Sequence, residues 1–241
     1  LRTGIMAGST CPTEVMKAVN HKMNMHDVQI AYGMTETSPV STQTAGDDPF
    51  DKRVSTVGTT QPHLESKIVD VATGELVQRG NIGELCTRGY SVMLRYWNNE
   101  QGTKTAIDDK GWMHTEDLAT MDEEGYVSIV GRIKDMVIRG GENVYPKEVE
   151  EFLYTHPAIS DVQVTGVPDA KYGEELIAWV KLHDNAEPVS TQQLKEFCKG
   201  QITHYKIPRY FKFVQEFPMT VTGKIMKFKM REISTKELDL G

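Results

Sequence analysis

The first forty residues alternate between strand-like and helix-like patterns. Residues 1–7 and 28–32 are short β-prone runs, and Gly33 follows the second of them. Between the two runs, the apolar side chains of residues 13–25 recur at the spacing of a helix. A strand, a helix and a second strand in this order predict an α/β unit.

From about residue 50 to 131 the pattern changes to short β-prone runs separated by turn residues. The clearest runs are 66–71, 83–88 and 126–130. Residues 100–107 carry the one helical pattern of this part. Strands at this spacing with little helix predict a small β-rich subdomain that resembles a barrel or a sandwich.

The last hundred residues alternate again between strands and helices. The residues on either side of Gly140-Gly141, from 135 to 145, read as a hairpin, and Pro146 is well placed as the first residue of a helix. On that helix Val149, Phe152 and Leu153 share one face. The later elements are strands at 160–167, 175–182 and 209–215, a helix at 190–202 with Leu194, Phe197 and Cys198 inward, and a last helix after Gly223.

These patterns predict a multidomain protein of mixed α/β and α+β class. Residues 1–131 would form one part, made of the end of an α/β subdomain (1–45) and the barrel-like, β-rich subdomain (50–131). A small α+β domain would occupy residues 135–241, and we place the junction at 132–134.

Composition and charge restrict the class of partner. The chain has 241 residues, 39% of them hydrophobic and 25% charged, as in ordinary folded proteins. Its 27 basic and 34 acidic residues give a net charge of −7, which argues against nucleic acid as the main partner because phosphate backbones are bound through clustered positive charge. No uncharged apolar stretch approaches the roughly 18 residues that a membrane helix needs.

The cysteines and histidines suggest a reducing compartment and no metal centre of their own. The cysteines number three and form no C-x-x-C pair, which argues against a disulfide framework. The seven histidines show no ligand spacing, so we predict no histidine or cysteine metal site. A cytoplasmic location follows, and an organellar matrix, peripheral membrane association and a homo-oligomer are all compatible with it.

One group of polar residues follows the second predicted strand. Tyr32, Gly33, Thr35 and Glu36 offer an aromatic ring, close backbone approach, a hydroxyl and a carboxylate within five residues. This set suits a nucleotide, with the ring on the base and the carboxylate on Mg²⁺. A turn followed by an N-capping threonine explains the same residues about equally well.

Three further groups have both a functional and a structural interpretation. Asp117 and Arg132 are suited to hold a ribose diol, although a lone aspartate is more often a solvated turn residue. Gly140-Gly141 has no side chains and so leaves a path for a thin ligand, but the same pair is also explained as a tight turn. Lys224 near a predicted helix start gains nothing from the helix dipole, which hints at an anionic ligand, but lone lysines there are usually surface residues.

Five blocks, in this order and at these distances, resemble the adenylate-forming superfamily, and within it the acyl-CoA synthetases. Residues 7–9 (A-G-S) are similar to the family's adenine-side segment and residues 32–36 (Y-G-M-T-E) to its Y-G-x-T-E motif. Residues 112–117 are similar to its W-x-x-T-G-D block, 131–146 to its hinge and hairpin, and 218–224 to its terminal P-x-T-x-[ST]-G-K. The ordered set covers essentially the whole chain.

The resemblance implies an adenine slot in the first part of the chain. Tyr32 would stack on the base, and Gly8, Ser9 and Gly33 would form the slot around it.

The resemblance also implies the groups that hold the rest of the nucleotide. Thr35 would bind the α-phosphate and Glu36 the Mg²⁺ ion. Asp117 and Arg132 would hold the ribose hydroxyls, with Ile129 packed near the sugar.

The last part of the chain would then serve both half-reactions of a ligase. Lys224 would bridge the fatty carboxylate and the α-phosphate during adenylation. Lys134 would be the hinge about which a mobile domain, residues 135–241, rotates to bring Gly140 and Gly141 to the path of the CoA pantetheine.

The activity implied for the parent protein is that of an ATP-dependent fatty acyl-CoA ligase of the medium- and long-chain type, which uses ATP, Mg²⁺ and CoA. Two departures stand out: Glu116 replaces the usual family glycine, and the Ser/Thr/Gly-rich phosphate loop is missing. Because Leu1 is also not a methionine, we expect the C-terminal part of a synthetase, inactive alone. A fatty acyl-AMP ligase, a peptide-synthetase adenylation domain and a non-catalytic nucleotide-binding fragment are the alternatives.

Overall fold

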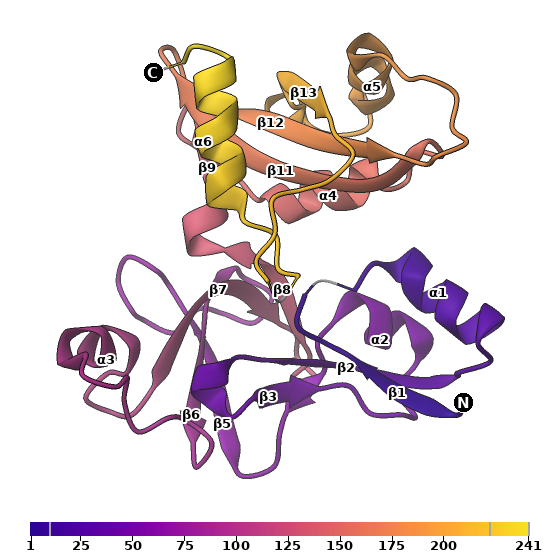
Figure 1. Cartoon of the computed structure of the whole chain (residues 1–241). Coiled ribbons are helices and arrows are strands. Elements are labelled where there is room, and N and C mark those ends of the chain that lie inside the picture. Colours follow the sequence, from indigo (N-terminus) through magenta and orange to yellow (C-terminus); the bar gives the residue numbers. More distant parts are fainter. Residues whose placement is uncertain (10, 222, 241) are drawn as a thin grey trace. The chain divides into compact units, whose positions relative to one another are not determined.

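The computed structural model describes residues 1–9, 11–221 and 223–240 and divides into two compact units, Leu1–Ile133 and Lys134–Gly241 (Figure 1). The division falls where the sequence pattern changes from β-rich to α+β. Each unit has its own sheets and its own buried clusters, and each is described separately below.

The first sheet of the first unit is built around a parallel pair of strands. Its order is β1-β2-β3-β4, in which β1 runs parallel to β2 and the other pairs are antiparallel. Its elements are β1 (Thr3–Met6), α1 (Thr13–Lys22), β2 (Asp27–Gly33), β3 (Val40–Gln43), α2 (Phe50–Ser55) and β4 (Thr59–Thr60).

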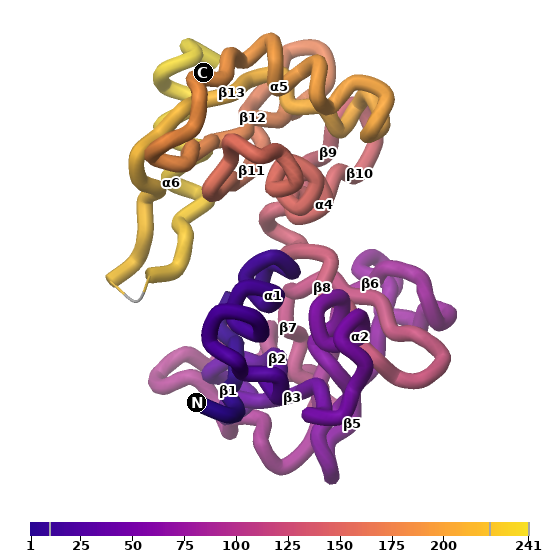
Figure 2. The backbone as a smooth tube through the Cα atoms, turned by 90° about the vertical axis from the view of Figure 1, so that its right-hand side faces the viewer, coloured from indigo at the N-terminus to yellow at the C-terminus, as the bar shows by residue number. Residues whose placement is uncertain are grey.

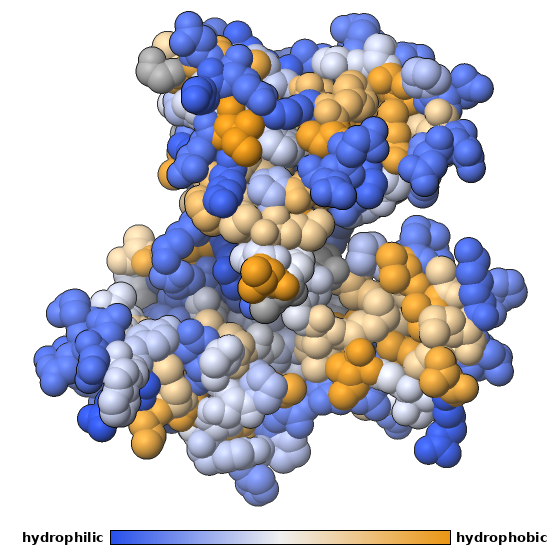
Figure 3. All heavy atoms as spheres, in the orientation of Figure 1, coloured by the Kyte–Doolittle hydropathy of each residue, from blue (hydrophilic) through white to orange (hydrophobic). Residues whose placement is uncertain are grey.

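Helices α1 and α2 pack against this first sheet through one apolar cluster. Met16 on α1, Val28 and Ile30 on β2, and Phe50 on α2 belong to it. The views in Figures 1 and 2 place both helices beside β2. Other apolar side chains of β1 and α1, such as Ile5, are exposed, and Figure 3 shows apolar surface over this part of the unit.

The second sheet of the first unit is an open antiparallel sheet in the order β5-β6-β7-β8. Alternate apolar residues such as Leu85 and Val127 form its core. The elements are β5 (Leu64–Val69), β6 (Gly83–Gly89), α3 (Glu100–Ala106), β7 (Met113–Met121) and β8 (Val127–Arg132). Among the described residues these strands do not close into the barrel suggested by the spacing of the runs.

The second unit is a five-stranded sheet covered by helices on both faces. Its order is β10-β9-β12-β11, and β13 adds to β12 in parallel. The elements are β9 (Val137–Arg139), β10 (Glu142–Val144), α4 (Pro146–Leu153), β11 (Ile159–Asp169), β12 (Gly173–Leu182), α5 (Thr191–Cys198), β13 (Tyr210–Phe213) and α6 (Lys227–Glu237).

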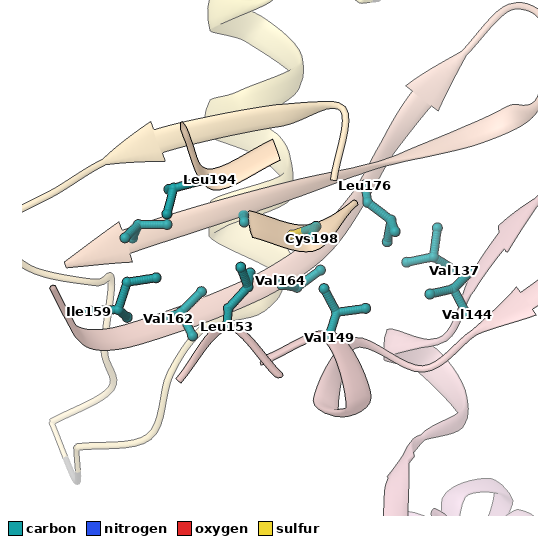
Figure 4. Close-up of a cluster of buried hydrophobic side chains, with 12 residues drawn as sticks. Val137, Val144, Val149, Leu153, Ile159, Val162, Val164, Leu176, Leu194 and Cys198 are labelled. Atoms are coloured by element: carbon teal, nitrogen blue, oxygen red, sulfur yellow. The ribbon is translucent and has the colours of Figure 1, made fainter. Parts of the chain in front are cut away.

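The alternation of side chains along β12 explains the layers of the second unit. Leu176, Ala178 and Val180 belong to the larger cluster, which includes side chains of α4 and α5 (Figure 4). Ile177 and Trp179 point to the other face and pack with Met230 of α6, where the Trp179 indole donates to Ser234 Oγ at 2.9 Å.

The mixed α/β and α+β class predicted from the sequence is confirmed, and the differences lie in individual elements. The patterns missed β3, β4, β7 and α2. Two helices end earlier than predicted, at Lys22 and at Cys198, and the last helix begins at Lys227 rather than directly after Gly223. Phe197 is only half-buried and stacks on Phe152, with ring centroids 5.1 Å apart.

Within the described residues, no helix combines the length and apolar character needed to cross a membrane.

Candidate functional site

A carboxylate on β7 is held by side chains from two other strands. Asp117 Oδ2 accepts a hydrogen bond from the Tyr32 hydroxyl at 2.6 Å, and its Oδ1 accepts one from Arg132 Nε at 3.0 Å. Arg132 is the cross-strand partner of Asp117 in the β7–β8 ladder. The Asp117 side chain is 10% exposed and that of Arg132 is 63% exposed, so the guanidinium remains open to solvent. The structure thus brings together three residues that the sequence singled out.

Tyr32 and Ile129 pack against one apolar cluster of the first unit. Both are half-buried and pack on the cluster that includes Leu85 and Val127. Burial, followed by the adjacent Asp117 carboxylate, raises the pKa of the Tyr32 phenol well above its usual range. Tyr32 therefore stays protonated and acts as a donor to Asp117.

Asp117 lies on a bulge of β7. In the ladder with β6, Glu84 pairs with Leu118 and Cys86 pairs with His114, so three residues of β7 oppose the single residue Leu85. Bulges of this kind commonly redirect a side chain next to a functional site. In this bulge, the Asp117 side chain is directed to Tyr32 and Arg132.

Glu116, in the middle of the bulge, has φ +58°. Residues other than glycine rarely adopt this left-handed region. Glu116, which stands where the resemblance led us to expect a glycine, therefore has a glycine-like backbone conformation, and its side chain is exposed. Its carboxylate places a negative charge next to Asp117 in the sequence.

Glu36 is held in place by a residue that the sequence did not single out. The Tyr96 hydroxyl donates to Glu36 Oε1 at 2.8 Å, and the Met93 N–H donates to the Glu36 carbonyl at 2.8 Å. Burial and the hydrogen bond to Glu36 raise the pKa of Tyr96 to about 12. Glu36 is half-buried in a single-turn helix, Thr35–Thr37, in which Thr35 is exposed.

The glycines of the expected adenine slot differ in their surroundings. Gly33 lies so close to the Pro39 carbonyl that an added Cβ would meet its oxygen at 1.6 Å. The packing of the chain itself therefore requires a glycine at position 33. The same absence of a side chain also suits close approach of a ligand. Gly8 has φ +88° and open space around it, and both it and Ser9 are exposed. The described contacts do not join Gly8 or Ser9 to Tyr32.

In the second unit, the paired glycines form the turn between β9 and β10. Gly140 and Gly141 have φ +61° and +90°, the combination found in type I′ hairpin turns. Arg139, which precedes them, donates to the buried Glu175 carboxylate at 2.8 and 2.6 Å, and its guanidinium lies 4.4 Å from the Tyr172 ring centroid. The turn is therefore anchored on its β9 side, and both glycines are exposed.

Lys224 lies in the loop between β13 and α6 rather than in a helix. Figure 2 shows that this loop projects from its unit. The Thr220 N–H donates to the Lys224 carbonyl at 2.8 Å, and the Lys224 N–H donates to Thr220 Oγ1 at 3.0 Å. Gly223 allows the turn with φ +82°, and the Lys224 residue is exposed. Thr222, the [ST] position of the terminal motif, lies outside the described residues.

Helix α6, which follows this loop, is tied to two other elements by one carboxylate. Glu150 on α4 accepts from Lys227 Nζ at 2.6 Å and from the Val164 N–H of β11 at 2.7 Å. Both charged side chains are largely buried, at 18% exposure for Lys227 and 12% for Glu150. Lys134, the expected hinge, is exposed in a single-turn helix, Ile133–Asp135, at the division between the units.

Sequence reasoning missed Glu84, Tyr96 and Glu150 because each acts on a residue far away in the sequence. Glu84 accepts from His114 Nδ1 at 2.7 Å, and Cys86 Sγ lies 3.6 Å from the same nitrogen. These three side chains could together hold a metal ion by position. A search for ligand spacing does not find them because they come from two strands.

Two family models match most of the chain. The model described as AMP-binding enzyme matches residues 1–97, and the one described as AMP-binding enzyme C-terminal domain matches residues 148–224. The first match lies within the unit Leu1–Ile133 and the second within the unit Lys134–Gly241.

Curated proteins and solved structures point to the same relatives. The chain is 58% identical over its full length to the putative acyl-CoA synthetase YngI of Bacillus subtilis, of which it covers 44%. It is 48% identical to the mitochondrial medium-chain acyl-CoA ligase ACSF2 of Bos taurus, of which it covers 39%. The ATP-bound crystal structure of MatB from Rhodopseudomonas palustris matches 97% of the chain with a TM-score of 0.90 and 34% identity, over 45% of MatB. The chain thus spans less than half the length of these relatives.

Proposed function

Because the chain belongs to the AMP-binding enzyme family, we propose that it is the C-terminal part of an ATP-dependent acyl-CoA ligase. The parent enzyme would convert a fatty carboxylate and ATP into an acyl adenylate and pyrophosphate, and would then transfer the acyl group to the thiol of CoA with release of AMP. The single observation that carries the proposal is the Asp117 carboxylate, held by Tyr32 and Arg132 in a chain whose relatives are acyl-CoA synthetases.

The first unit would bind the nucleotide. Asp117 would accept hydrogen bonds from the ribose hydroxyls, and the solvent-open Arg132 would donate to the same sugar. The Tyr32 ring would stack on adenine in a slot with Gly8, Ser9 and Gly33, and Ile129 would line the sugar. The Tyr32 hydroxyl, which binds Asp117, fixes the position of both groups.

The phosphates and the metal ion would lie at Thr35 and Glu36. Mg²⁺ is a hard cation that prefers carboxylate and phosphate oxygens with several waters. Glu36 fits this requirement, since Tyr96 donates to its Oε1 and orients the carboxylate. The ion would neutralise the phosphate charge, while the exposed Thr35 would bind the α-phosphate.

The second unit would act in both half-reactions. During adenylation, the Lys224 ammonium would contact the fatty carboxylate and the α-phosphate and offset the charge that gathers on the transferred group. After pyrophosphate leaves, rotation about Lys134 would remove Lys224 and present Gly140 and Gly141, where the absence of side chains leaves a path for pantetheine.

The proposal is tested with the full-length enzyme in two assays. Exchange of labelled pyrophosphate into ATP, dependent on a fatty acid, reports adenylation, and appearance of the CoA thioester reports transfer. Both activities are expected for the full-length enzyme, and no ATP turnover is expected for the 241-residue chain. Adenylation without CoA transfer would instead show a fatty acyl-AMP ligase or an adenylation domain. The absence of both activities would favour a non-catalytic nucleotide-binding protein.

A further inference from the structure

A buried carboxylate lies behind the bulge that carries Asp117. Glu84, on β6, is 8% exposed and takes no part in the contacts proposed for the nucleotide. Its Oε1 accepts the backbone N–H of Glu116 at 3.0 Å, and its Oε2 accepts from His114 Nδ1 at 2.7 Å. Because a carboxylate only accepts, the proton of His114 lies on Nδ1.

The bulge needs this acceptor because its backbone cannot use the sheet ladder. Three residues of β7 oppose Leu85 alone, so the regular pairing is interrupted between His114 and Leu118. Thr115 Oγ1 fills part of the gap: it donates to the Leu85 carbonyl at 2.7 Å and accepts the Asp117 N–H at 3.1 Å. The Glu116 N–H is satisfied by Glu84.

The same hydrogen bond stabilises an unfavourable backbone. A glutamate at φ +58° is less stable than one in the right-handed region, because its Cβ comes too close to the following carbonyl oxygen. The bond to Glu84 helps to offset this cost, because opening the loop would leave an acceptor buried and unpaired. Because Asp117 is the next residue, the backbone conformation of Glu116 determines the direction in which the Asp117 side chain points.

We propose that Glu84 is the positioning residue for Asp117: it holds Glu116 in the left-handed conformation and thereby aims the Asp117 carboxylate at the ribose hydroxyls. The inference rests on the proposed function, because it assigns the ribose to Asp117. His114 in turn orients Glu84, and Asp108 Oδ2 lies 3.9 Å from the second ring nitrogen of His114.

A metal ion is the competing interpretation of this cluster, since Glu84, Cys86 and His114 offer ligand atoms within 4.8 Å of one another. Both carboxylate oxygens of Glu84 already accept hydrogen bonds from protein groups, one from the Glu116 N–H and one from His114 Nδ1, and the Cys86 thiol is fully buried. Lys67, whose ammonium lies over the Trp112 ring, is the cross-strand partner of Cys86 and adds a positive charge there. The hydrogen-bonded arrangement is therefore favoured.

The test compares Glu84→Ala and Glu84→Gln in the full-length enzyme. The control is Glu65→Ala. Glu65 lies on the neighbouring strand β5, and its carboxylate accepts hydrogen bonds from Arg88 and not from the bulge. The probes are AMP and 2′,3′-dideoxy-AMP, whose affinity ratio measures recognition of the ribose diol. Hydrogen exchange of the Glu116 and Asp117 amides, measured without nucleotide, reports the loop itself.

We expect Glu84→Ala to reduce the preference for AMP over the dideoxy analogue by about tenfold and to speed exchange at Glu116. Glu84→Gln keeps an acceptor for the Glu116 N–H and should restore both properties, and Glu65→Ala should change neither. In an Asp117→Asn background, Glu84→Ala should have no further effect on the ratio.

Three results would overturn the inference: an unchanged ratio in Glu84→Ala, unchanged exchange at Glu116, or stoichiometric Zn²⁺ binding that Cys86→Ala abolishes. A wild-type enzyme that binds both nucleotides equally would count against the proposed role of Asp117 instead. The exchange measurement would still decide whether Glu84 holds the loop.

Discussion

The Tyr32 hydroxyl and the Asp117 carboxylate, 85 residues apart in the sequence, form a 2.6 Å hydrogen bond between two different sheets. Tyr32 is the residue before the last of β2 in the first sheet, and Asp117 lies on β7 in the second. The bond joins the two halves of the first unit at the place where we propose that the nucleotide binds. Its removal should therefore affect stability as well as binding.

Tyr32→Phe should lower the free energy of unfolding by about 1.5–3 kcal/mol, the range for a hydrogen bond to a charged group. The phenylalanine keeps the ring in its apolar cluster but leaves Asp117 with one donor fewer. Urea unfolding measures the effect. The control is Tyr126→Phe, which removes a 2.6 Å bond to the more exposed Asp48 and should cost less. Equal losses in the two variants would contradict the prediction.

Stability should fall at alkaline pH because of Tyr96. Burial, followed by the hydrogen bond to Glu36, raises its pKa from 10.0 to about 12 in the folded chain. A group whose pKa is raised on folding contributes stability below its unfolded pKa and loses it as the pH rises through the folded value. The free energy of unfolding should decline between about pH 10 and pH 12, and Tyr96→Phe should make that decline shallower. Urea titrations of both proteins at several pH values measure this, and parallel curves would refute it.

The elements predicted best from the sequence are those whose pattern is local. The hairpin around Gly140-Gly141 and the helix that begins at Pro146 depend on turn chemistry and side-chain spacing within a few residues. Strand β7 was missed because its bulge interrupts the alternation of buried and exposed positions. The terminal helix was placed too early because Lys224 belongs to a loop closed by its own hydrogen bonds to Thr220.

The candidate site was predictable only in part for a similar reason. Asp117 and Arg132 could be paired because they fit one family motif and the strand that follows it. Glu84 and Tyr96 could not be found, because their roles arise from contacts at 2.8–3.0 Å with residues that are 32 and 60 positions away. Such contacts depend on strand register and loop packing, which a single sequence does not reveal.

The strain at Glu116 can be measured by comparing two substitutions. Glu116→Gly and Glu116→Ala both remove the side chain, but only glycine adopts φ +58° without a steric penalty. The glycine variant should therefore be more stable than the alanine variant by about 1 kcal/mol, even though glycine loses more entropy on folding. Thermal or urea unfolding measures the difference. An alanine variant as stable as the glycine variant would show that the loop relaxes.

Glu150 should contribute much more to the second unit than its neighbour Glu148 on the same helix. Glu150→Ala leaves the largely buried Lys227 without its carboxylate and should cost about 3 kcal/mol, as for broken buried ion pairs. Glu148→Ala breaks a pair with Lys206 in which Glu148 is 49% exposed, and should cost about 1 kcal/mol or less. Hydrogen exchange of the β11 and β12 amides measures both. Similar costs would contradict the ranking.

Lys224→Ala should separate the two half-reactions of the full-length enzyme. Lys224 is assigned to adenylation alone, where its charge would offset charge on the transferred group, so the adenylation rate should fall by at least about 10²-fold. Transfer of acyl groups from a supplied acyl adenylate to CoA should stay at the wild-type rate, because the lysine has no part in that step. Lys229→Ala removes an exposed lysine five residues later in α6 and serves as the control, with both rates unchanged. Since the Thr220–Lys224 loop is closed by backbone groups and by Thr220 Oγ1, the substitution leaves its hydrogen bonds intact. An equal loss of both half-reactions would therefore contradict the assignment of Lys224 to adenylation alone, and could not be explained by damage to the loop.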